Sequence, residues 1–306
     1  MPTPSLLMTL NAVLVIGSVT IDRNVCAGRT FRKIGGVATY AGLTYRLHGL
    51  PTRIACNVAP PDAAILAPLR KAGIQVQNGR TPNTTRFVNR IDGIRRTQEM
   101  PSIASPIRGR LVDPVLKHVD CIHLGPLHPD DIALAVFARL DRTDASVTLD
   151  IQGLVRGCDR TRIVPAVSHH LAAALQAADI VKSDQEELGL VIEAYGAGID
   201  AVMKRFDIAE WVATSASKGG CIHVRGSRRR SYKPVPVDVP VDPTGAGDVF
   251  FAAYTAARLH LRKTPAVAVR HAARLSSDHI AGRYIPAETL GLAPVSTVPE
   301  PEAPRR

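Results

Sequence analysis

A turn of small residues lies between an extended segment and an apolar helical run in the C-terminal part of the chain. The extended segment covers residues 231–239, the helical run covers residues 249–261, and the turn reads Val241-Asp242-Pro243-Thr244-Gly245-Ala246-Gly247-Asp248. In the run, apolar side chains recur at the spacing of a helix that buries one face. Pro243 and Gly245 mark the turn, and we expect Thr244 to cap the helix.

This turn has the chemistry of an anion site. Gly245, Ala246 and Gly247 carry almost no side chain, so the unpaired N–H groups of the first helical turn are open to phosphate oxygens. We expect Asp248 to stay ionised, because the helix end favours negative charge. Such donors beside a base suit phosphoryl transfer. A Gly-Ala-Gly-Asp string alone is equally compatible with a helix start that binds no ligand.

The longer pattern Asp-x-Thr-Gly-Ala-Gly-Asp-x-Phe, at residues 242–250, is more specific. It closely resembles the C-terminal signature of the PfkB (ribokinase-like) carbohydrate kinases. The resemblance implies that Asp248 is the catalytic base, that residues 245–247 form the anion hole, and that Thr244, Gly245 and Gly247 contact the nucleotide. It also implies that Asp242 lies near a monovalent-cation site, which leaves K⁺ open as a cofactor.

The order of predicted elements indicates an α/β fold. From residue 120 on, strands and helices alternate, which favours a parallel sheet with helices on both faces. The strands are expected at 121–124, 147–150, 179–182, 210–216 and 221–225, and the helices at 130–140, 168–178, 185–195 and 265–280. With the resemblance, this predicts a ribokinase-like doubly wound, mainly parallel sheet. We expect one kinase domain over residues 1–293 and a Pro-rich, disordered tail over 294–306.

A small β lid is expected to interrupt this alternation. Residues 85–91 and 94–100 read as two strands joined at Asp92-Gly93, a strong hairpin signal. A lone hairpin is marginal in water, so it must pack on something. We place the lid at about residues 23–36 and 83–101, over the substrate site. Members of the resembling family often pair through their lids, which leaves a homodimer open here.

Substrate contacts are predicted at the N-terminal end. Residues 13–19 read as a buried strand, and Asp22 follows where open α/β sheets bind ligands. Gly35-Gly36 precedes a helix expected at 37–48 and allows close backbone approach to a ligand. The resemblance implies that Asp22 holds substrate hydroxyls and that this Gly pair lies at the substrate pocket. Tyr40 stands where the family often has Asn, which indicates a different acceptor.

Further polar residues follow predicted strand ends. Asp150 and Gln152 follow one strand, and Ser183 and Glu186 follow the next, so all four should face one crevice. A carboxylate such as Glu186 at a helix start either holds Mg²⁺ through water or stabilises the helix end. The resemblance favours the first, because the family carries Asn-x-x-Glu here, with Ser183 in place of Asn.

A second nucleotide segment is implied at Thr214-x-Ala216-x-x-Gly219. It resembles the family's Thr-x-Gly-x-x-Gly loop, with Ala216 in place of a glycine. A plain hairpin is the alternative.

The composition excludes several classes of protein. The 306 residues hold 45% hydrophobic and 21% charged side chains, as in a globular protein, and the chain has no apolar run long enough to cross a membrane. Five cysteines without a CxxC pair favour a reducing cytoplasm. The net charge of +11 is spread along the chain, and the one tight cluster, residues 228–230, lacks interleaved aromatic residues. We therefore expect no nucleic-acid partner and no membrane partner.

The ten histidines do not predict a metal site. His118, His123 and His128 are spaced by five, and His169 and His170 are adjacent. Neither spacing matches a metal-ligand motif, so we interpret these residues as structural or surface side chains.

These features predict an ATP-dependent kinase that uses Mg²⁺ and phosphorylates a hydroxyl of a small polyol or sugar. Asp150-Ile151-Gln152, Arg156 and Lys182-Ser183 resemble the myo-inositol kinase branch of the family, which favours a cyclic polyol. A nucleoside or furanose sugar remains an alternative. A kinase-like binding or regulatory protein without turnover is another, because of Ser183 and Ala216.

Overall fold

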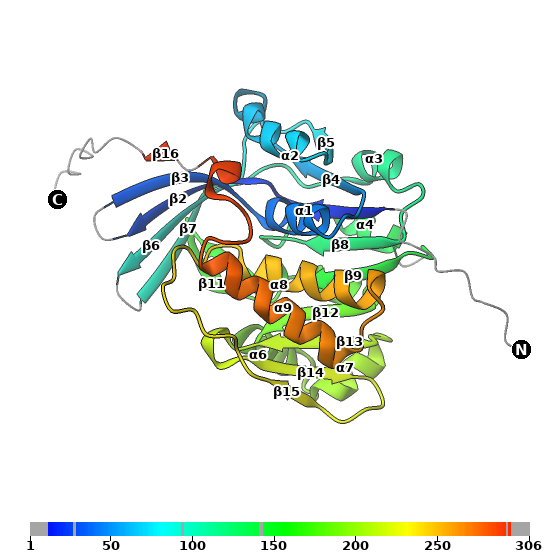
Figure 1. The fold of residues 1–306 in the computed structure, drawn as a ribbon. Helices are drawn as coiled ribbons and strands as arrows, with labels where there is room; N and C mark the ends of the chain where they lie inside the picture. The colour runs from blue at the N-terminus through cyan, green and yellow to red at the C-terminus, as the bar shows by residue number, and fades with distance from the viewer. Residues whose placement is uncertain (1–11, 27–28, 93–94, 141–142, 292, 295–306) are drawn as a thin grey trace, which may run out of the picture.

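Two sheets build the molecule, as the ribbon in Figure 1 shows. The computed structural model describes residues 12–26, 29–92, 95–140, 143–291 and 293–294. Within this part of the chain the larger sheet has nine strands, in the order β15 (Arg230–Tyr232), β14 (Gly220–Val224), β13 (Glu210–Thr214), β12 (Ile180–Asp184), β9 (Ser146–Asp150), β8 (Cys121–Gly125), β1 (Val13–Gly17), β4 (Thr52–Asn57) and β5 (Gln75–Gly79). Only the pairs β13–β14 and β14–β15 are antiparallel. The predicted mainly parallel α/β sheet is confirmed.

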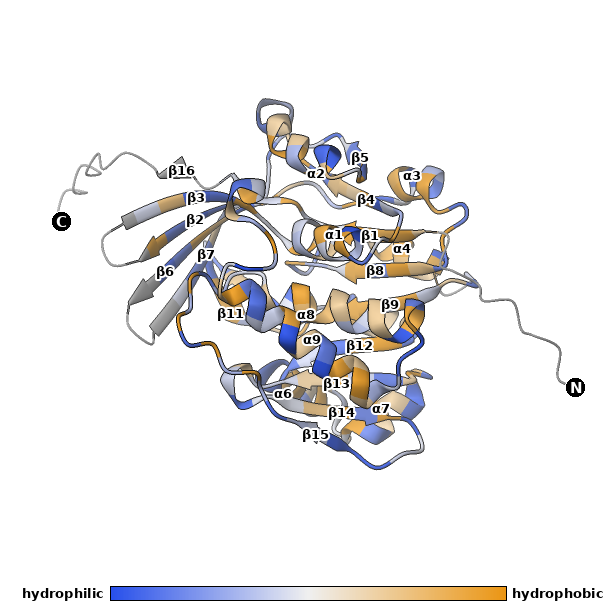
Figure 2. Ribbon diagram, in the orientation of Figure 1, coloured by the Kyte–Doolittle hydropathy of each residue, from blue (hydrophilic) through white to orange (hydrophobic). Residues whose placement is uncertain are grey.

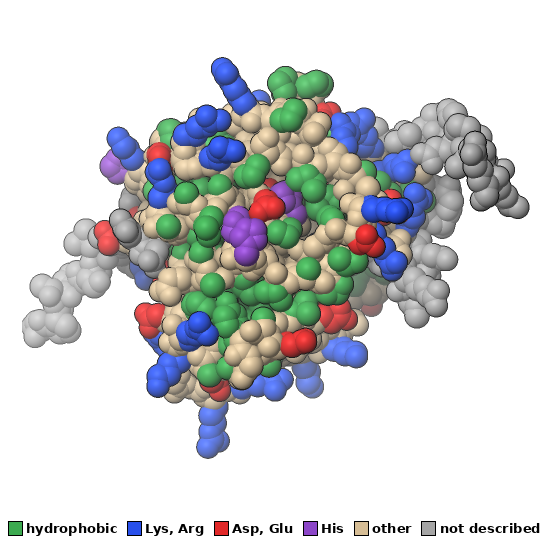
Figure 3. All heavy atoms as spheres, turned by 180° about the vertical axis from the view of Figure 1, so that it is seen from behind, with side chains coloured by type: hydrophobic (Ala, Val, Ile, Leu, Met, Phe, Trp, Pro, Cys, Tyr) green, Lys and Arg blue, Asp and Glu red, His purple; other side chains and the backbone are tan. Residues whose placement is uncertain are grey.

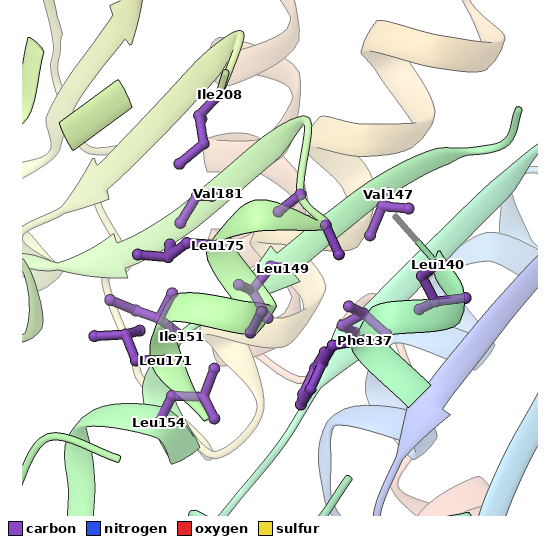
Figure 4. Close-up of a cluster of buried hydrophobic side chains, with 14 of the residues drawn as sticks. Phe137, Leu140, Val147, Leu149, Ile151, Leu154, Leu171, Leu175, Val181 and Ile208 are labelled. Carbon is purple, nitrogen blue, oxygen red and sulfur yellow. The ribbon is translucent and has the colours of Figure 1, made fainter. Parts of the chain in front are cut away.

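Helices cover both faces of this sheet. One face packs against α1 (Val37–Leu47), α2 (Ala67–Lys71), α8 (Ala246–Thr255) and α9 (Pro265–Ile280). The other packs against α3 (Gly109–Val112), α4 (Leu134–Leu140), α5 (Leu171–Gln176), α6 (Gln185–Tyr195) and α7 (Ile199–Arg205). Because both faces are covered, a central strand such as β1 is apolar throughout and wholly buried. Figure 2 shows this apolar centre, and Figure 4 shows part of the buried cluster beneath α4 and α5.

The second sheet is larger than the predicted lid. Its order is β10 (Arg156–Asp159), β11 (Arg162–Pro165), β7 (Arg95–Ser102), β6 (Arg86–Asp92), β2 (Thr20–Cys26), β3 (Arg29–Gly35) and β16 (Ala293–Pro294). The strands β2, β3, β6 and β7 correspond to the predicted lid segments, whereas β10, β11 and β16 were not expected. Asp92 pairs with Arg95, so residues 93 and 94 join β6 to β7, and Gly93 of the predicted turn lies outside the described residues.

The N-terminal strand prediction was wrong at its end. The expected single strand 13–19 stops at Gly17, where a Cβ atom would lie 2.5 Å from the Gly125 carbonyl oxygen of the neighbouring strand. The chain then crosses to the second sheet, so Asp22 lies within β2.

At the C-terminal end, Pro294 pairs with Phe31 of β3, while residues 295–306 of the predicted tail lie outside the described residues. The boundaries 1–293 and 294–306 stay a prediction. No helix in the described part of the chain is long and apolar enough to cross a membrane.

Candidate active site

A cavity of about 130 Å³ lies where the two sheets meet. It is lined by residues from both sheets and from the start of α8: Thr20, Asp22, Gly36, Tyr40, Phe87, Gln98, Leu127, Gln152, Arg156, Lys182, Pro243, Thr244, Gly245, Gly247 and Asp248. Eight of these are predicted site residues: Asp22, Gly36, Tyr40, Gln152, Thr244, Gly245, Gly247 and Asp248. The sequence pattern therefore located residues that are distant in the chain and adjacent in space.

The helix α8 begins at this cavity. Its N-cap is Gly245, whose φ of 83° is a backbone conformation that favours glycine. Gly247 and Asp248 lie in the first turn, where amide groups have no acceptor within the helix. The Ala246 N–H donates to the Pro243 carbonyl at 3.2 Å and is not available to a ligand. The anion donors that remain from the predicted set are thus the amides of Gly245 and Gly247.

Thr244 does not cap the helix, so that prediction was wrong. The N-cap makes no side-chain hydrogen bond, because the turn places Gly245 at the cap position. The Thr244 hydroxyl instead accepts from Asn24 Nδ2 at 3.4 Å, which ties the turn to β2 of the second sheet.

Asp248 is half-buried, and its carboxyl group is harder to ionise than the sequence suggested. Burial, together with the charge of Asp150, raises its pKa to about 7, although the charges of Lys182 and Arg156 oppose this rise. The expectation that the helix end alone keeps Asp248 ionised was therefore wrong. A carboxylate with a pKa near 7 is well matched to general-base chemistry near neutral pH.

Lys182 brings a buried positive charge to the same place. Its Nζ atom donates to Asp150 Oδ2 at 2.9 Å, and both side chains are buried. A Cβ atom on Gly247 would lie 3.5 Å from this ammonium group, so the charge stands beside the first turn of α8. Burial alone would lower the pKa of Lys182, but the charges of Asp150 and Glu187 outweigh it and hold the pKa above its ordinary value. The ammonium group stays charged and can neutralise an anion at this turn.

Asp22 enters the cavity from β2. Its Oδ1 atom accepts from Thr20 Oγ1 at 2.6 Å. A Cβ atom on Gly35 would lie 2.2 Å from the Asp22 carboxylate, so glycine is required for the close approach of β3. Gly36, with φ of 87°, then starts α1 at the cavity wall. Gly35 therefore shapes the wall without lining it.

Comparison with known proteins agrees with this geometry. Residues 65–280 match the pfkB family carbohydrate kinases. The chain belongs to the PfkB family. Members of this family are phosphotransferases that act on hydroxyl groups of sugars or polyols, and this chain is one of them. The search of curated proteins gives no match.

Solved structures show the same ribokinase fold. A pyrophosphate-dependent kinase of the ribokinase family, complexed with a pyrophosphate analogue and myo-inositol, aligns with a TM-score of 0.75 at 21% identity, over 88% of this chain and 94% of that one. Ribokinase from Thermotoga maritima aligns with a TM-score of 0.69 at 17% identity, over 92% and 96%. A nucleoside kinase from Burkholderia thailandensis in complex with inosine aligns with a TM-score of 0.72 at 18% identity, over 88% and 91%.

Tyr40, which departs from the usual kinase pattern, joins α1 to α8. Its ring is buried beneath the turn, where a Cβ atom on Gly245 would lie 2.5 Å from ring carbons. His279 of α9 packs edge-on to the ring, with centroids 5.4 Å apart. Tyr40 therefore packs against the turn at Gly245 and also lines the cavity.

Asp242, the residue expected at a monovalent-cation site, forms an ion pair with Lys33. The Lys33 side chain is wholly buried. Burial would raise the pKa of Asp242, but the Lys33 charge and hydrogen bonds from Lys33 and Thr244 hold it below its ordinary value. Asp242 is thus an ionised carboxylate with a protein cation beside it.

Three residues expected at the kinase nucleotide site are used in packing. The Ser183 hydroxyl is wholly buried and accepts from Trp211 Nε1 at 2.9 Å. Thr214 Oγ1 donates to the Ser183 carbonyl at 3.3 Å. A Cβ atom on Gly219 would lie 2.2 Å from the Tyr232 carbonyl oxygen. None of the three lines the cavity, and neither does Ala216, which has φ of 42°.

The two glutamates at the start of α6 differ in environment. Glu186, the predicted magnesium ligand, is exposed. Glu187 is buried, and its Oε2 atom accepts from the Asp184 N–H at 2.7 Å while Asp184 accepts from the Glu187 N–H. Burial raises the pKa of Glu187, which the charge of Lys182 opposes. Glu187 is thus electrostatically linked to the site, although it is also half of a capping box.

Several residues of the site were not predicted from the sequence. Lys182 carried a usable signal, because a lone lysine inside an apolar strand must be paired when buried. Lys33 carried none, since it directly follows the exposed Arg32 in a strand with mixed polar and apolar residues. Gln98 and Phe87 reach the cavity through the pairing of β6 and β7, which residue type alone does not show.

Proposed function

We propose that this kinase transfers the γ-phosphate of ATP to a hydroxyl of a small polyol or sugar, with myo-inositol or a related cyclic polyol as the favoured acceptor. One observation carries the proposal: Asp248 and the first-turn amides of α8 line the same small cavity as the polar side chains of the second sheet. A donor phosphate and an acceptor hydroxyl can therefore meet at one turn.

In this mechanism, Asp248 accepts the proton of the acceptor hydroxyl as its oxygen bonds to the transferred phosphorus. The phosphoanhydride bond breaks, and its electron pair leaves with the nucleoside diphosphate. The amides of Gly245 and Gly247, with the Lys182 ammonium group, stabilise the charge on the transferred group. Asp22, Gln98 and Gln152 orient the acceptor through its hydroxyls.

The carboxylates near the cavity suit Mg²⁺ only in a water-mediated role. Asp150 is taken by Lys182 and Glu187 by the Asp184 backbone, whereas Glu186 is exposed in the first turn of α6. Glu186 therefore fits a hydrated Mg²⁺ ion, which would be carried largely by the donor phosphates and would neutralise their charge. Residue Glu187 is the alternative if the capping box opens.

The size of the cavity favours a small acceptor. Drug-sized ligands occupy pockets of roughly 300–1,000 Å³. The volume here is about 130 Å³. A single-ring polyol or sugar suits this volume better than a nucleoside, which remains the alternative acceptor of the same family.

Pyrophosphate is a second candidate donor. The supporting observation is that Ser183, Thr214 and Gly219 are engaged in packing contacts, while Lys182 beside Gly247 offers charge to a bare phosphate group. Three similar structures are described as structures of pyrophosphate-dependent kinases. Pyrophosphate has no nucleobase, so this donor needs no pocket for one.

We also propose that K⁺ is not required, because the Lys33 ammonium group already neutralises Asp242. Turnover should be equal in potassium and in tetramethylammonium buffers. Strong activation by potassium would contradict this role of Lys33.

A two-way screen tests the proposed function. ATP and pyrophosphate are each supplied with Mg²⁺ to the intact protein, together with inositols, pentoses, hexoses or nucleosides, and phosphorylated products are separated by mass. We expect a phosphomonoester of a polyol or sugar. Donor binding without any product would favour the alternative of a kinase-like regulatory protein.

A further inference from the structure

A second cavity lies apart from the active site. Its volume is about 640 Å³, and its walls include Pro106, Leu134, His128, Asp130 and His170. It shares no lining residue with the active-site cavity, although Leu127 lines that cavity and His128 lines this one. The loop between β8 and α4 therefore separates two cavities, of which the proposed kinase reaction uses one.

Asp130 and His170, which line this second cavity, lie close to a further histidine, His169. The ligating atoms of Asp130, His169 and His170 all lie within 4.8 Å of one another, a spacing from which the three side chains could hold a metal ion. His169 Nε2 is 4.0 Å from Asp130 Oδ1, and the two side chains are 73% and 61% exposed. Figure 3 shows histidines beside an acidic side chain on the face turned away in Figure 1, bordered by hydrophobic side chains. An exposed ion pair of this kind contributes little to the stability of the fold.

His170 is held in the orientation of a metal ligand. Its Nδ1 atom lies 3.0 Å from the Pro129 carbonyl oxygen. Because a carbonyl can only accept, Nδ1 is the donor in this contact, which leaves Nε2 as the ring nitrogen available to a ligand. This arrangement, with one ring nitrogen donating to a backbone carbonyl, fixes the tautomer of metal-binding histidines. The ring is buried and packs against Phe137, so it is a rigid side of the site.

We propose that Asp130, His169 and His170 bind a divalent transition-metal ion, with Zn²⁺ as the reference ion. Two imidazoles and one carboxylate are a ligand set that suits zinc, and three protein ligands leave a fourth position open. Tetrahedral zinc with bonds of about 2.0–2.1 Å needs ligand atoms roughly 3.4 Å apart. The exposed side chains of Asp130 and His169 can turn to close the remaining distance onto His170.

The cavity offers a polar group beyond the three ligands. His128 is buried, lines this cavity, and its Nε2 atom has no hydrogen-bond partner among the described residues; its nearest charged neighbour is Asp131 Oδ1 at 3.6 Å. An unpaired buried polar atom is costly, and a bound water or ligand offsets the cost. A water or ligand bound at the fourth coordination position of the ion would therefore share this cavity with His128.

Calorimetric titration of the intact, tag-free protein with ZnCl₂ tests this site. We expect one ion per chain, and binding at least about tenfold weaker in each of Asp130→Asn, His169→Ala and His170→Ala. Asp130→Asn and His169→Ala change exposed side chains, so these two variants still test the site if His170→Ala fails to fold. His118→Asn, at an exposed histidine elsewhere, and His271→Ala, at the His48–His271 pair, are the matched controls. Absence of binding, or binding that only the control variants reduce, would overturn the proposal.

Discussion

The surroundings of Asp248 disfavour the ionised form of its carboxyl group. Its replacement by Asn keeps the shape of the side chain and removes the base. We predict that Asp248→Asn lowers kcat by about 10²–10⁴-fold, the usual contribution of a general base. Steady-state kinetics with the best donor and acceptor measure the effect, and circular dichroism checks the fold. Near-normal turnover in a folded variant would reject the role of Asp248.

The raised pKa of Asp248 sets a pH dependence of both activity and stability. With a pKa of about 7, the base is protonated at lower pH, so kcat/KM should fall by about tenfold per unit below pH 7. The folded protein also binds this proton more tightly than the unfolded chain does. The contribution of Asp248 to the free energy of unfolding is therefore lost as pH rises from about 4 through 7.

Asp248→Asn should therefore be more stable than the native protein at pH 8, by about 1–3 kcal/mol after allowance for partial exposure, and no more stable at pH 4. Urea unfolding at both pH values measures the difference. Equal stability of the two proteins at pH 8 would mean that the carboxylate is well solvated.

Lys182 serves both folding and charge stabilisation, and a double variant separates the two. Lys182→Met leaves Asp150 as an unpaired buried charge, which costs about 3–5 kcal/mol of folding free energy. We predict that Lys182→Met/Asp150→Asn recovers most of this stability but not the turnover. Thermal unfolding and kcat are measured for both variants. Full activity in the double variant would exclude Lys182 from the reaction.

At the scale of elements, two glycines of one turn have separable roles. Gly245 has φ of 83° and lies against the Tyr40 ring, so Gly245→Ala should destabilise the fold by about 1–3 kcal/mol or more. At Gly247 an added Cβ atom meets only Lys182 Nζ, at an ordinary 3.5 Å. We predict that Gly247→Ala unfolds like the native protein and loses kcat/KM, because the methyl group narrows the approach of the phosphate. The reverse pattern in unfolding and kinetic assays would contradict this division.

The strongest sequence patterns predicted whole elements. The helices α6 and α9 begin and end at the predicted residues, because each has a clear start signal and a continuous apolar face. The hairpin β10–β11 was not predicted, since each of its strands is only four residues long, and β11 pairs with β7 only in the folded chain. Similarly, Asp130 joins His169 and His170 through tertiary packing, which the spacing of histidines cannot show.

At the scale of the whole molecule, the active-site cavity joins two sheets that the chain crosses between several times. Asp22 comes from the second sheet, whereas Lys182 and Asp248 belong to the large sheet and its helices. A homodimer through the second sheet stays a prediction, and sedimentation of the intact protein would measure it.

Ligands that bridge the cavity should stabilise both sheets together. At a hundred times the dissociation constant, bound ligand adds about 2.7 kcal/mol to the free energy of unfolding. We predict that the acceptor with a non-hydrolysable donor slows amide exchange both in β2 and in the first turn of α8. Asp22→Asn should weaken acceptor-dependent protection and leave donor-dependent protection intact. Protection confined to one sheet would contradict a shared site.

The central claim is that phosphoryl transfer takes place at the first turn of α8. Phosphorus NMR of the native protein and of Asp248→Asn, each with donor, Mg²⁺ and myo-inositol, tests it most directly. The account predicts a new phosphomonoester signal with the native protein, formed at least about a hundredfold more slowly with Asp248→Asn. Formation of the same product at equal rates by both proteins would contradict it.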